Sequence, residues 1–133
     1  MVEGECNCCA VAFKVDAKLT DVFVCHCSIC RKSTASGGIA VAIVGNEKFC
    51  WIRGRDQISF WSKPGHDWHT FFCKNCGSAL PGENDQNHMY IPVGTITLGH
   101  ESLRVAHHLF VNYKAPWEEI CDSGKQHPEG YES

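Results

Sequence analysis

Seven of the ten cysteines in the chain stand in three tight groups. The groups are Cys6-Asn-Cys8, Cys25-His-Cys27-Ser-Ile-Cys30 and Cys73-Lys-Asn-Cys76. Thiolates bind zinc in tetrahedral arrays with Zn–S distances of about 2.3 Å, and a C-x-x-C turn brings two sulfurs onto one ion. Backbone N–H groups of such a turn, often closed by a glycine such as Gly77, can donate hydrogen bonds to the sulfurs. Three groups in one chain therefore predict bound zinc.

Seven ligands divide naturally into a set of four and a set of three. A site with four thiolates is closed and structural, whereas a site with three protein ligands leaves a position for water or substrate. Three sulfurs in a short segment can cap one face of an ion, which predicts an open, catalytic zinc held by Cys25, Cys27 and Cys30. The closed site would then be formed by Cys6, Cys8, Cys73 and Cys76. It would tie the first strand to a distant turn, so that folding depends on metal.

Other roles for these cysteines are less well supported by the sequence. Two cysteine pairs could form a redox dithiol, but no βαβ pattern surrounds them. The three-cysteine group could instead be a second structural site completed by His26, Cys9 or another side chain. Cys9, Cys50 and Cys121 lie outside the motifs, and we expect each to be a small buried hydrophobic residue.

The length and composition predict one globular domain, and the sequence predicts that it is intracellular. The chain has 133 residues and a formal charge of -3, and its Lys and Arg residues are not clustered, so we expect no nucleic-acid partner. Neither a signal peptide nor an apolar run long enough to span a membrane is present, which makes the cytoplasm the expected location. In a reducing compartment, cysteines favour metal binding over disulfides. The oligomeric state is left open.

The hydrophobic pattern predicts a mainly β domain with little helix. Short segments rich in β-branched and aromatic residues alternate with turn residues, at 10–15, 20–25, 38–44, 48–53, 57–62, 68–73, 88–93 and 106–111. The first two, separated by Asp16-Ala-Lys, are predicted to form a hairpin. Only residues 27–33 look able to form a helical turn or two. We expect 1–133 to be a single domain that ends in an irregular tail, 118–133.

The aromatic residues have two possible roles. The core is the favoured place for the four tryptophans and seven phenylalanines, because these side chains supply most of the volume that such a domain needs. The segment from Trp61 to Trp68, which also holds His66, could instead line the mouth of a pocket. The pair His107-His108 is expected to be structural or at the surface.

Five elements of the sequence resemble the glutathione-dependent formaldehyde-activating enzyme family, which also includes centromere protein V. In chain order they are Gly4-Glu-Cys6-Asn-Cys8, Cys25-His-Cys27-Ser-Ile-Cys30-Arg-Lys, Phe72-Cys73-Lys-Asn-Cys76-Gly-Ser, Pro92-Val-Gly-Thr95, and His108-Leu-Phe-Val with Ala115-Pro-Trp117. The resemblance implies an Mss4-like zinc-binding β fold, with a structural zinc on Cys6, Cys8, Cys73 and Cys76 and a catalytic zinc on Cys25, Cys27 and Cys30. Two departures are Cys9, where the family usually has glycine, and Thr95-Ile-Thr-Leu in place of Thr-Leu-Asp.

The resemblance also implies an activity. The expected reaction joins glutathione to formaldehyde or another small aldehyde, forming an S-hydroxyalkyl adduct, and belongs to the carbon-sulfur lyases run in reverse. The zinc would hold the glutathione sulfur as a thiolate or polarise the aldehyde oxygen. Cations that could receive the two glutathione carboxylates are Arg31, Lys32, Arg53 and Arg55. The alternative is a non-catalytic zinc module of the centromere protein V type, which binds a protein partner.

Overall fold

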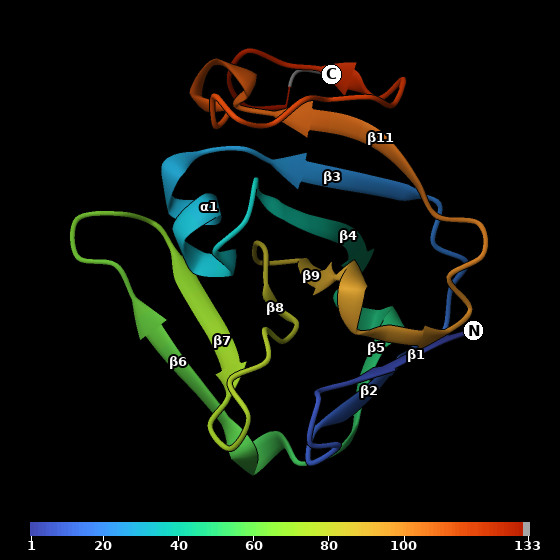
Figure 1. Cartoon of the computed structure of the whole chain (residues 1–133). Helices are drawn as coiled ribbons and strands as arrows, with labels where there is room; N and C mark the ends of the chain where they lie inside the picture. The colour runs from blue at the N-terminus through green and yellow to red at the C-terminus, as the bar shows by residue number, and fades with distance from the viewer. Residues whose placement is uncertain (132–133) are drawn as a thin grey trace.

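Short strands pair into three sheets in the computed structural model, which describes residues 1–131 (Figure 1). The first sheet has the strand order β10-β1-β2-β5 and is antiparallel. Its strands are β1 (Val2–Glu5), β2 (Ala12–Val15), β5 (Phe49–Arg53) and β10 (Ile96–Leu98). The third sheet is the hairpin of β6 (Ile58–Ser62) and β7 (His69–Cys73).

The second sheet has six strands in the order β12-β11-β3-β4-β9-β8. These strands are β3 (Asp21–Cys25), β4 (Ile39–Gly45), β8 (Gly82–Glu83), β9 (His88–Pro92), β11 (Arg104–Leu109) and β12 (Lys125–Gln126). β11 lies parallel to both β3 and β12, whereas the remaining pairs are antiparallel.

Helical structure in the described part of the chain is limited to one short α-helix and four 3₁₀ turns. The helix α1 (Ser28–Thr34) follows β3 directly and begins inside the second cysteine group. The 3₁₀ turns are η1 (Asn46–Lys48), η2 (Arg55–Gln57), η3 (Val93–Thr95) and η4 (Val111–Tyr113). The mainly β, single-domain fold class is confirmed. Over residues 1–131, no helix has the length and apolar character to cross a membrane.

The main core lies between the first two sheets. Phe13 and Val15 of β2 meet Ala42 and Val44 of β4, and Ile91 of β9 completes the contact. Burying side chains of this kind stabilises a fold by roughly 1.5–3 kcal/mol each. A second cluster joins Cys6 and Cys73 to Val11 and Leu80, which places the outer cysteines in an apolar setting.

The predicted hairpin between residues 10–15 and 20–25 is wrong. β2 pairs with β1 on one side and β5 on the other, and β3 pairs with β11 and β4 in a different sheet. Both edges of β2 are therefore occupied, and its hydrogen-bonding groups have no capacity for β3. The strand segments themselves were predicted well, whereas their partners were not.

The expectation that the tryptophans form the core is also largely wrong. Trp61 is 51% exposed and Trp117 is 72% exposed, and Phe60 is 65% exposed. Of the tryptophans, Trp51 packs against both core clusters, beside Phe13 and Phe49. Aliphatic residues take the volume that aromatic residues were expected to fill.

The C-terminal segment lies along β11 at one edge of the second sheet (Figure 1). β12 pairs with β11 through the register His107–Lys125 and His108–Gln126. The rest of 118–131 has no further strand or helix of its own, and Ala115, just before it, is buried. Residues 132 and 133, the end of the predicted tail, lie outside the described residues.

Candidate metal centres and active site

The first and third cysteine groups come together although they are far apart in sequence. Cys6 follows β1, Cys8 lies in the next turn, Cys73 ends β7, and Cys76 lies in the turn beyond it. The four sulfurs lie within 4.8 Å of one another. Cys6 and Cys73 are buried, while Cys8 is exposed. The cluster therefore joins the first sheet to the β6–β7 hairpin.

The sulfur spacing fits a tetrahedral ion. Four sulfurs at about 2.3 Å from a central zinc are about 3.8 Å apart from one another. The Sγ atoms of Cys6 and Cys8 are 3.7 Å apart, and so are those of Cys8 and Cys73. The four thiols and their spacing therefore fit a structural zinc ion.

Hydrogen bonds from nearby groups stabilise thiolates in this cluster. The backbone N–H of Val11 donates to Cys6 Sγ at 3.4 Å, and the Ser78 hydroxyl lies 3.2 Å from Cys76 Sγ. The Ser78 hydrogen bond lowers the pKa of Cys76 to about 5, and one from Asn75 lowers the pKa of Cys8. Burial raises the pKa of Cys6 to about 11. Gly77 closes the turn at φ 78°, in the left-handed region that favours glycine.

The second cysteine group forms a separate cluster at the junction of β3 and α1. Cys25 ends β3, Cys27 is the N-cap of α1, and Cys30 lies in the first turn of the helix. Their three sulfurs also lie within 4.8 Å of one another. Cys27 Sγ accepts a hydrogen bond from the backbone N–H of Cys30 at 3.4 Å. Among the described residues, this set contains three ligand atoms and the other set contains four.

The thiols of this cluster share protons unequally. The hydrogen bond from Cys30 lowers the pKa of Cys25 to about 6, although burial acts against it. The same hydrogen bond, together with burial, raises the pKa of Cys30. The shared hydrogen bond therefore favours the thiolate form of Cys25 and the thiol form of Cys30, and a metal ion bound by both sulfurs would displace the proton from Cys30.

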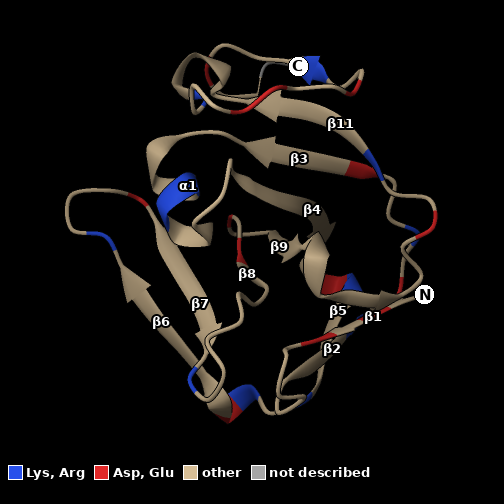
Figure 2. Cartoon of the chain, in the orientation of Figure 1, with Lys and Arg blue, Asp and Glu red and all other residues tan. Residues whose placement is uncertain are grey.

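Cys25 and Cys30 line a cavity of about 420 Å³. Its floor is formed by residues of the second sheet, and Trp68 and His69 line it from the β6–β7 hairpin. A second cavity, of about 410 Å³, shares Trp68 with the first and has Lys32 and Lys63 in its lining. Figure 2 shows the corresponding basic stretches on α1 and in the β6–β7 loop.

The four cations considered from the sequence divide into two groups. Lys32 lines the cavity beside α1, while Arg31 has a buried Nε that makes no hydrogen bond to a described residue. Arg53 is paired with Glu5 at 3.1 Å and donates to the carbonyl of Cys9 at 2.9 Å. Neither Arg53 nor Arg55 lines the cavity at Cys25 and Cys30 or the cavity that holds Lys32 and Lys63. Lys63 had no signal in the sequence beyond its charge.

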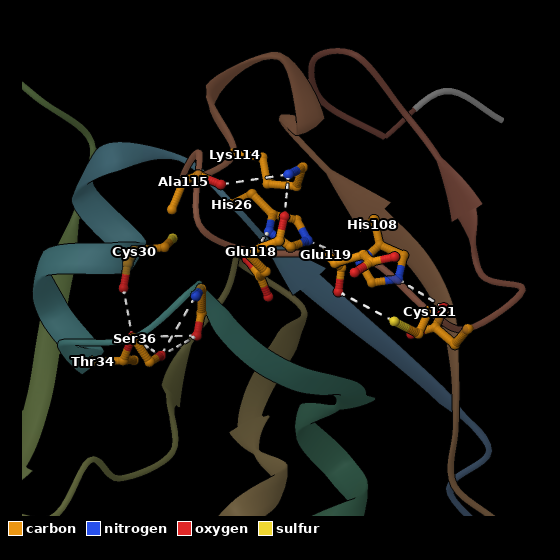
Figure 3. A network of polar contacts seen from close by, with 12 residues as sticks. His26, Cys30, Thr34, Ser36, His108, Lys114, Ala115, Glu118, Glu119 and Cys121 are labelled. Carbon is orange, nitrogen blue, oxygen red and sulfur yellow. Dashed lines mark hydrogen bonds and ion pairs between the residues drawn. The ribbon is translucent and has the colours of Figure 1, made fainter.

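A chain of buried histidines supports the loop between Cys25 and Cys27 (Figure 3). His26 is fully buried, with Nδ1 at 3.1 Å from Glu118 and Nε2 at 2.8 Å from His108. His108 Nε2 in turn lies 2.8 Å from Asp122. Both ring nitrogens of His26 are engaged with these partners, so His26 is not available to complete a closed metal site.

The carboxylates that bind these histidines belong to Glu118 and Asp122, and the local sequence around them does not predict this role. Glu118 follows Ala115-Pro-Trp117, and its carboxylate packs directly on Gly37, where a Cβ would lie 2.3 Å from it. The spacing of Glu118 from His26 is 92 residues, so no local pattern connects them. The structural role expected for His108 fits its burial.

The three remaining cysteines are exposed, so the expectation that they are buried hydrophobic residues is wrong. Cys9 belongs to neither cluster and adopts φ 65°. That backbone conformation is in the left-handed region, which favours glycine. Cys50 and Cys121 donate to backbone carbonyls of their own segments. All ten cysteines have free thiols in the structure.

Comparison with known proteins identifies a family and a shared fold. The sequence profile of the glutathione-dependent formaldehyde-activating enzyme family matches residues 1–113. A protein of Halomonas elongata, named "Putative glutathione-dependent formaldehyde-activating enzyme", is 31% identical over 132 residues, covering 90% of this chain and 81% of that protein.

A crystal structure of a Rhodobacter sphaeroides protein has the same fold, with a TM-score of 0.54 and 20% identity. The match covers 70% of this chain and 85% of that one. The extent of the profile match and the identity to the Halomonas protein show that the chain belongs to the glutathione-dependent formaldehyde-activating enzyme family.

Proposed function

We propose that the protein binds two zinc ions and joins glutathione to an aldehyde at the three-cysteine site, a carbon-sulfur bond formation of the lyase class. The observation that carries the proposal is the contrast between the two clusters. One has four sulfurs at tetrahedral spacing in an apolar setting, and the other has three sulfurs of which two line a cavity. Three protein ligands leave a position for a substrate atom. Two candidates for a fourth ligand do not complete the cluster. Cys9 lies outside it, and both ring nitrogens of His26 are bound to Glu118 and His108.

The residues around the site have separable roles in this reaction. Bound zinc would supply a stabilised glutathione thiolate or Lewis acidity toward the aldehyde oxygen. Cys25, Cys27 and Cys30 would hold the ion, and the hydrogen bond at the N-cap of α1 would orient Cys27. The cavity beside α1 offers Lys32 and Lys63 to the two glutathione carboxylates. Trp68 lines both cavities, so glutathione whose sulfur binds beside Cys25 and Cys30 would place its carboxylates in the cavity lined by Lys32 and Lys63.

Zinc stoichiometry and glutathione binding test the proposal together. Elemental analysis of protein purified under reducing conditions should find two zinc ions per chain, and Cys27→Ala should retain one while remaining folded. Calorimetry should detect glutathione binding to the wild type and not to Cys27→Ala. The wild type should also accelerate adduct formation from glutathione and formaldehyde above the uncatalysed rate. One zinc in the wild type, or two with no glutathione binding, would contradict the enzyme and favour a non-catalytic module of the centromere protein V type.

A further inference from the structure

The cavity at Cys25 and Cys30 has a continuous apolar floor provided by one face of the second sheet. Phe23 and Cys25 alternate on β3, so they share a face. Ile39, Val41 and Ile43 do the same on β4, and all of them line the cavity. The register places Phe23 opposite Val41, and Ile43 opposite Tyr90 of β9. Leu109 of β11 extends the floor beside Cys25.

The floor is separate from the hydrophobic core. Ala42 and Val44, which alternate with the cavity-lining residues of β4, are buried in the core on the opposite face. Ile39, Val41 and Ile43 are only partly buried. β4 therefore has apolar side chains on both faces, and those on the cavity face line the cavity while remaining partly exposed. They are accessible to a ligand that enters the cavity.

The walls of this cavity do not suit an anion. Its polar lining includes the carboxylates Asp67 and Glu83, with Asn84 and His69, and no lysine or arginine is among its described lining residues. Glutathione carries two carboxylates, which these walls would repel. Lys32 and Lys63 line the neighbouring cavity instead. The charge distribution thus directs the peptide to one cavity and leaves the other for its reaction partner.

The size of the cavity also exceeds the needs of a one-carbon electrophile. Its volume is about 420 Å³. Formaldehyde has two heavy atoms and the bulk of about two water molecules, each of which takes up roughly 30 Å³ in the liquid. Trp68 and Tyr131 add aromatic surface to the walls. Tyr131 lies beyond residues 1–113, so this wall is outside the segment that the family profile matches.

We propose that the aldehyde used by this protein carries an apolar chain or ring, which lies on the floor formed by Phe23, Val41, Ile43 and Tyr90. The inference rests on the proposed function and specifies its electrophile. The carbonyl carbon would lie at the cysteine cluster, where the glutathione sulfur forms a bond to it. The carbon-oxygen π bond opens, and the oxygen receives the proton that the thiol has lost. The product is the S-(1-hydroxyalkyl) adduct of glutathione, with no redox change.

The test is a chain-length series measured as acceleration over the uncatalysed reaction. Butanal and hexanal have carbonyls of similar reactivity, so the ratio of their kcat/KM values reports on the hydrocarbon alone. Each buried methylene is worth roughly a fourfold gain, so hexanal, which has two more methylenes, should exceed butanal by roughly fifteenfold. The single substitutions Val41→Phe and Ile43→Phe would each fill the space above the floor that the hydrocarbon chain occupies. Each should bring this ratio close to one.

Leu98→Phe is the matched control, because Leu98 is exposed on β10 and lines neither the cavity at Cys25 and Cys30 nor the cavity that holds Lys32 and Lys63. It should leave the ratio unchanged, and thermal unfolding should show each variant to be folded. A hexanal-to-butanal ratio near one in the wild type, or a ratio that both floor variants leave intact, overturns the inference. If formaldehyde is accelerated in that case, the proposed function stands without it. If no aldehyde is accelerated by protein holding two zinc ions, the proposed function fails and this inference fails with it.

Discussion

At the scale of single residues, the site depends on hydrogen bonds that favour thiolates. A hydrogen bond from Ser78 lowers the pKa of Cys76 to about 5, and one from Cys30 lowers the pKa of Cys25 to about 6. Each cluster therefore has a cysteine with a pKa below 7. Each cluster also has a cysteine whose pKa is raised, Cys6 by burial and Cys30 chiefly by its hydrogen bond to Cys25. Such mixed clusters hold protons that metal binding releases.

Substitution of Cys76 by serine is expected to destabilise the whole fold. It removes one of four ligands from a cluster that joins the first sheet to the β6–β7 hairpin. Structural zinc contributes directly to folding free energy, so we expect a loss of at least about 3 kcal/mol and a fall in Tm of roughly 10 °C or more. Calorimetric unfolding with zinc analysis measures both. Cys121→Ser is the control, because Cys121 is exposed and outside both clusters, and equal Tm values for the two variants would contradict a structural metal.

Tyr90 should make the protein sensitive to alkaline pH. Burial raises the pKa of Tyr90 from its ordinary value of 10.0 to about 12. The folded state therefore holds a proton that the unfolded state loses, so this contribution to stability is present below pH 10.0 and is lost as the pH rises toward 12. The loss amounts to roughly 3 kcal/mol. A phenolate absorbance titration should show one late-titrating tyrosine, which disappears in Tyr90→Phe. An unchanged titration in that variant would refute the assignment.

At the scale of elements, the Cys25–Cys30 segment is supported by the C-terminal segment. β3 ends at Cys25 and α1 begins just after Cys27, so His26 lies at the bend between strand and helix. The partners of His26 come from β11 and from Glu118, and Asp122 holds His108 in turn. A buried polar chain of this kind is stabilising only while each member has a partner.

Glu118→Ala should weaken metal binding by the three-cysteine cluster without changing any of its ligands. It leaves His26 Nδ1 buried with one partner fewer, which costs roughly 1–3 kcal/mol. We expect faster zinc loss from the Cys25 cluster in a chelator assay, together with a lower urea midpoint. Glu119→Ala is the matched control, since the side chain is exposed and adjacent, and its effect should stay within about 0.5 kcal/mol. Indistinguishable zinc release in the two variants would exclude a positioning role for Glu118.

At the scale of the whole molecule, the two clusters occupy different environments. The four-cysteine cluster lies against a hydrophobic cluster that includes Val11 and Leu80, whereas the three-cysteine cluster opens onto a cavity. Metal exchange requires access to the ligands, so the two sites should differ in lability. The open site should respond to chelators first.

Stepwise removal of zinc should therefore proceed in two phases. A colorimetric chelator is expected to take one equivalent quickly, with loss of glutathione binding and little change in far-ultraviolet circular dichroism. The second equivalent should leave only with unfolding. Protein preloaded with glutathione should lose the first equivalent more slowly, because the thiol supplies a further ligand. Release of both ions in a single phase without unfolding would contradict the assignment of structural and open sites.

Much of this organisation follows from local sequence. The cysteine groups, most strand positions and the helix α1 were predictable because ligand spacing, β-branched runs and turn residues act over a few positions. Strand pairing was not, as the missed partnership of β3 with β11 shows, because it depends on contacts between distant segments. The same is true of the contact between Glu118 and His26, of the cavity that Lys63 and Lys32 both line, and of the apolar cavity floor. Residue types and their spacing thus specify which atoms can bind metal, while long-range packing sets what lies beside that metal and which substrate it can receive.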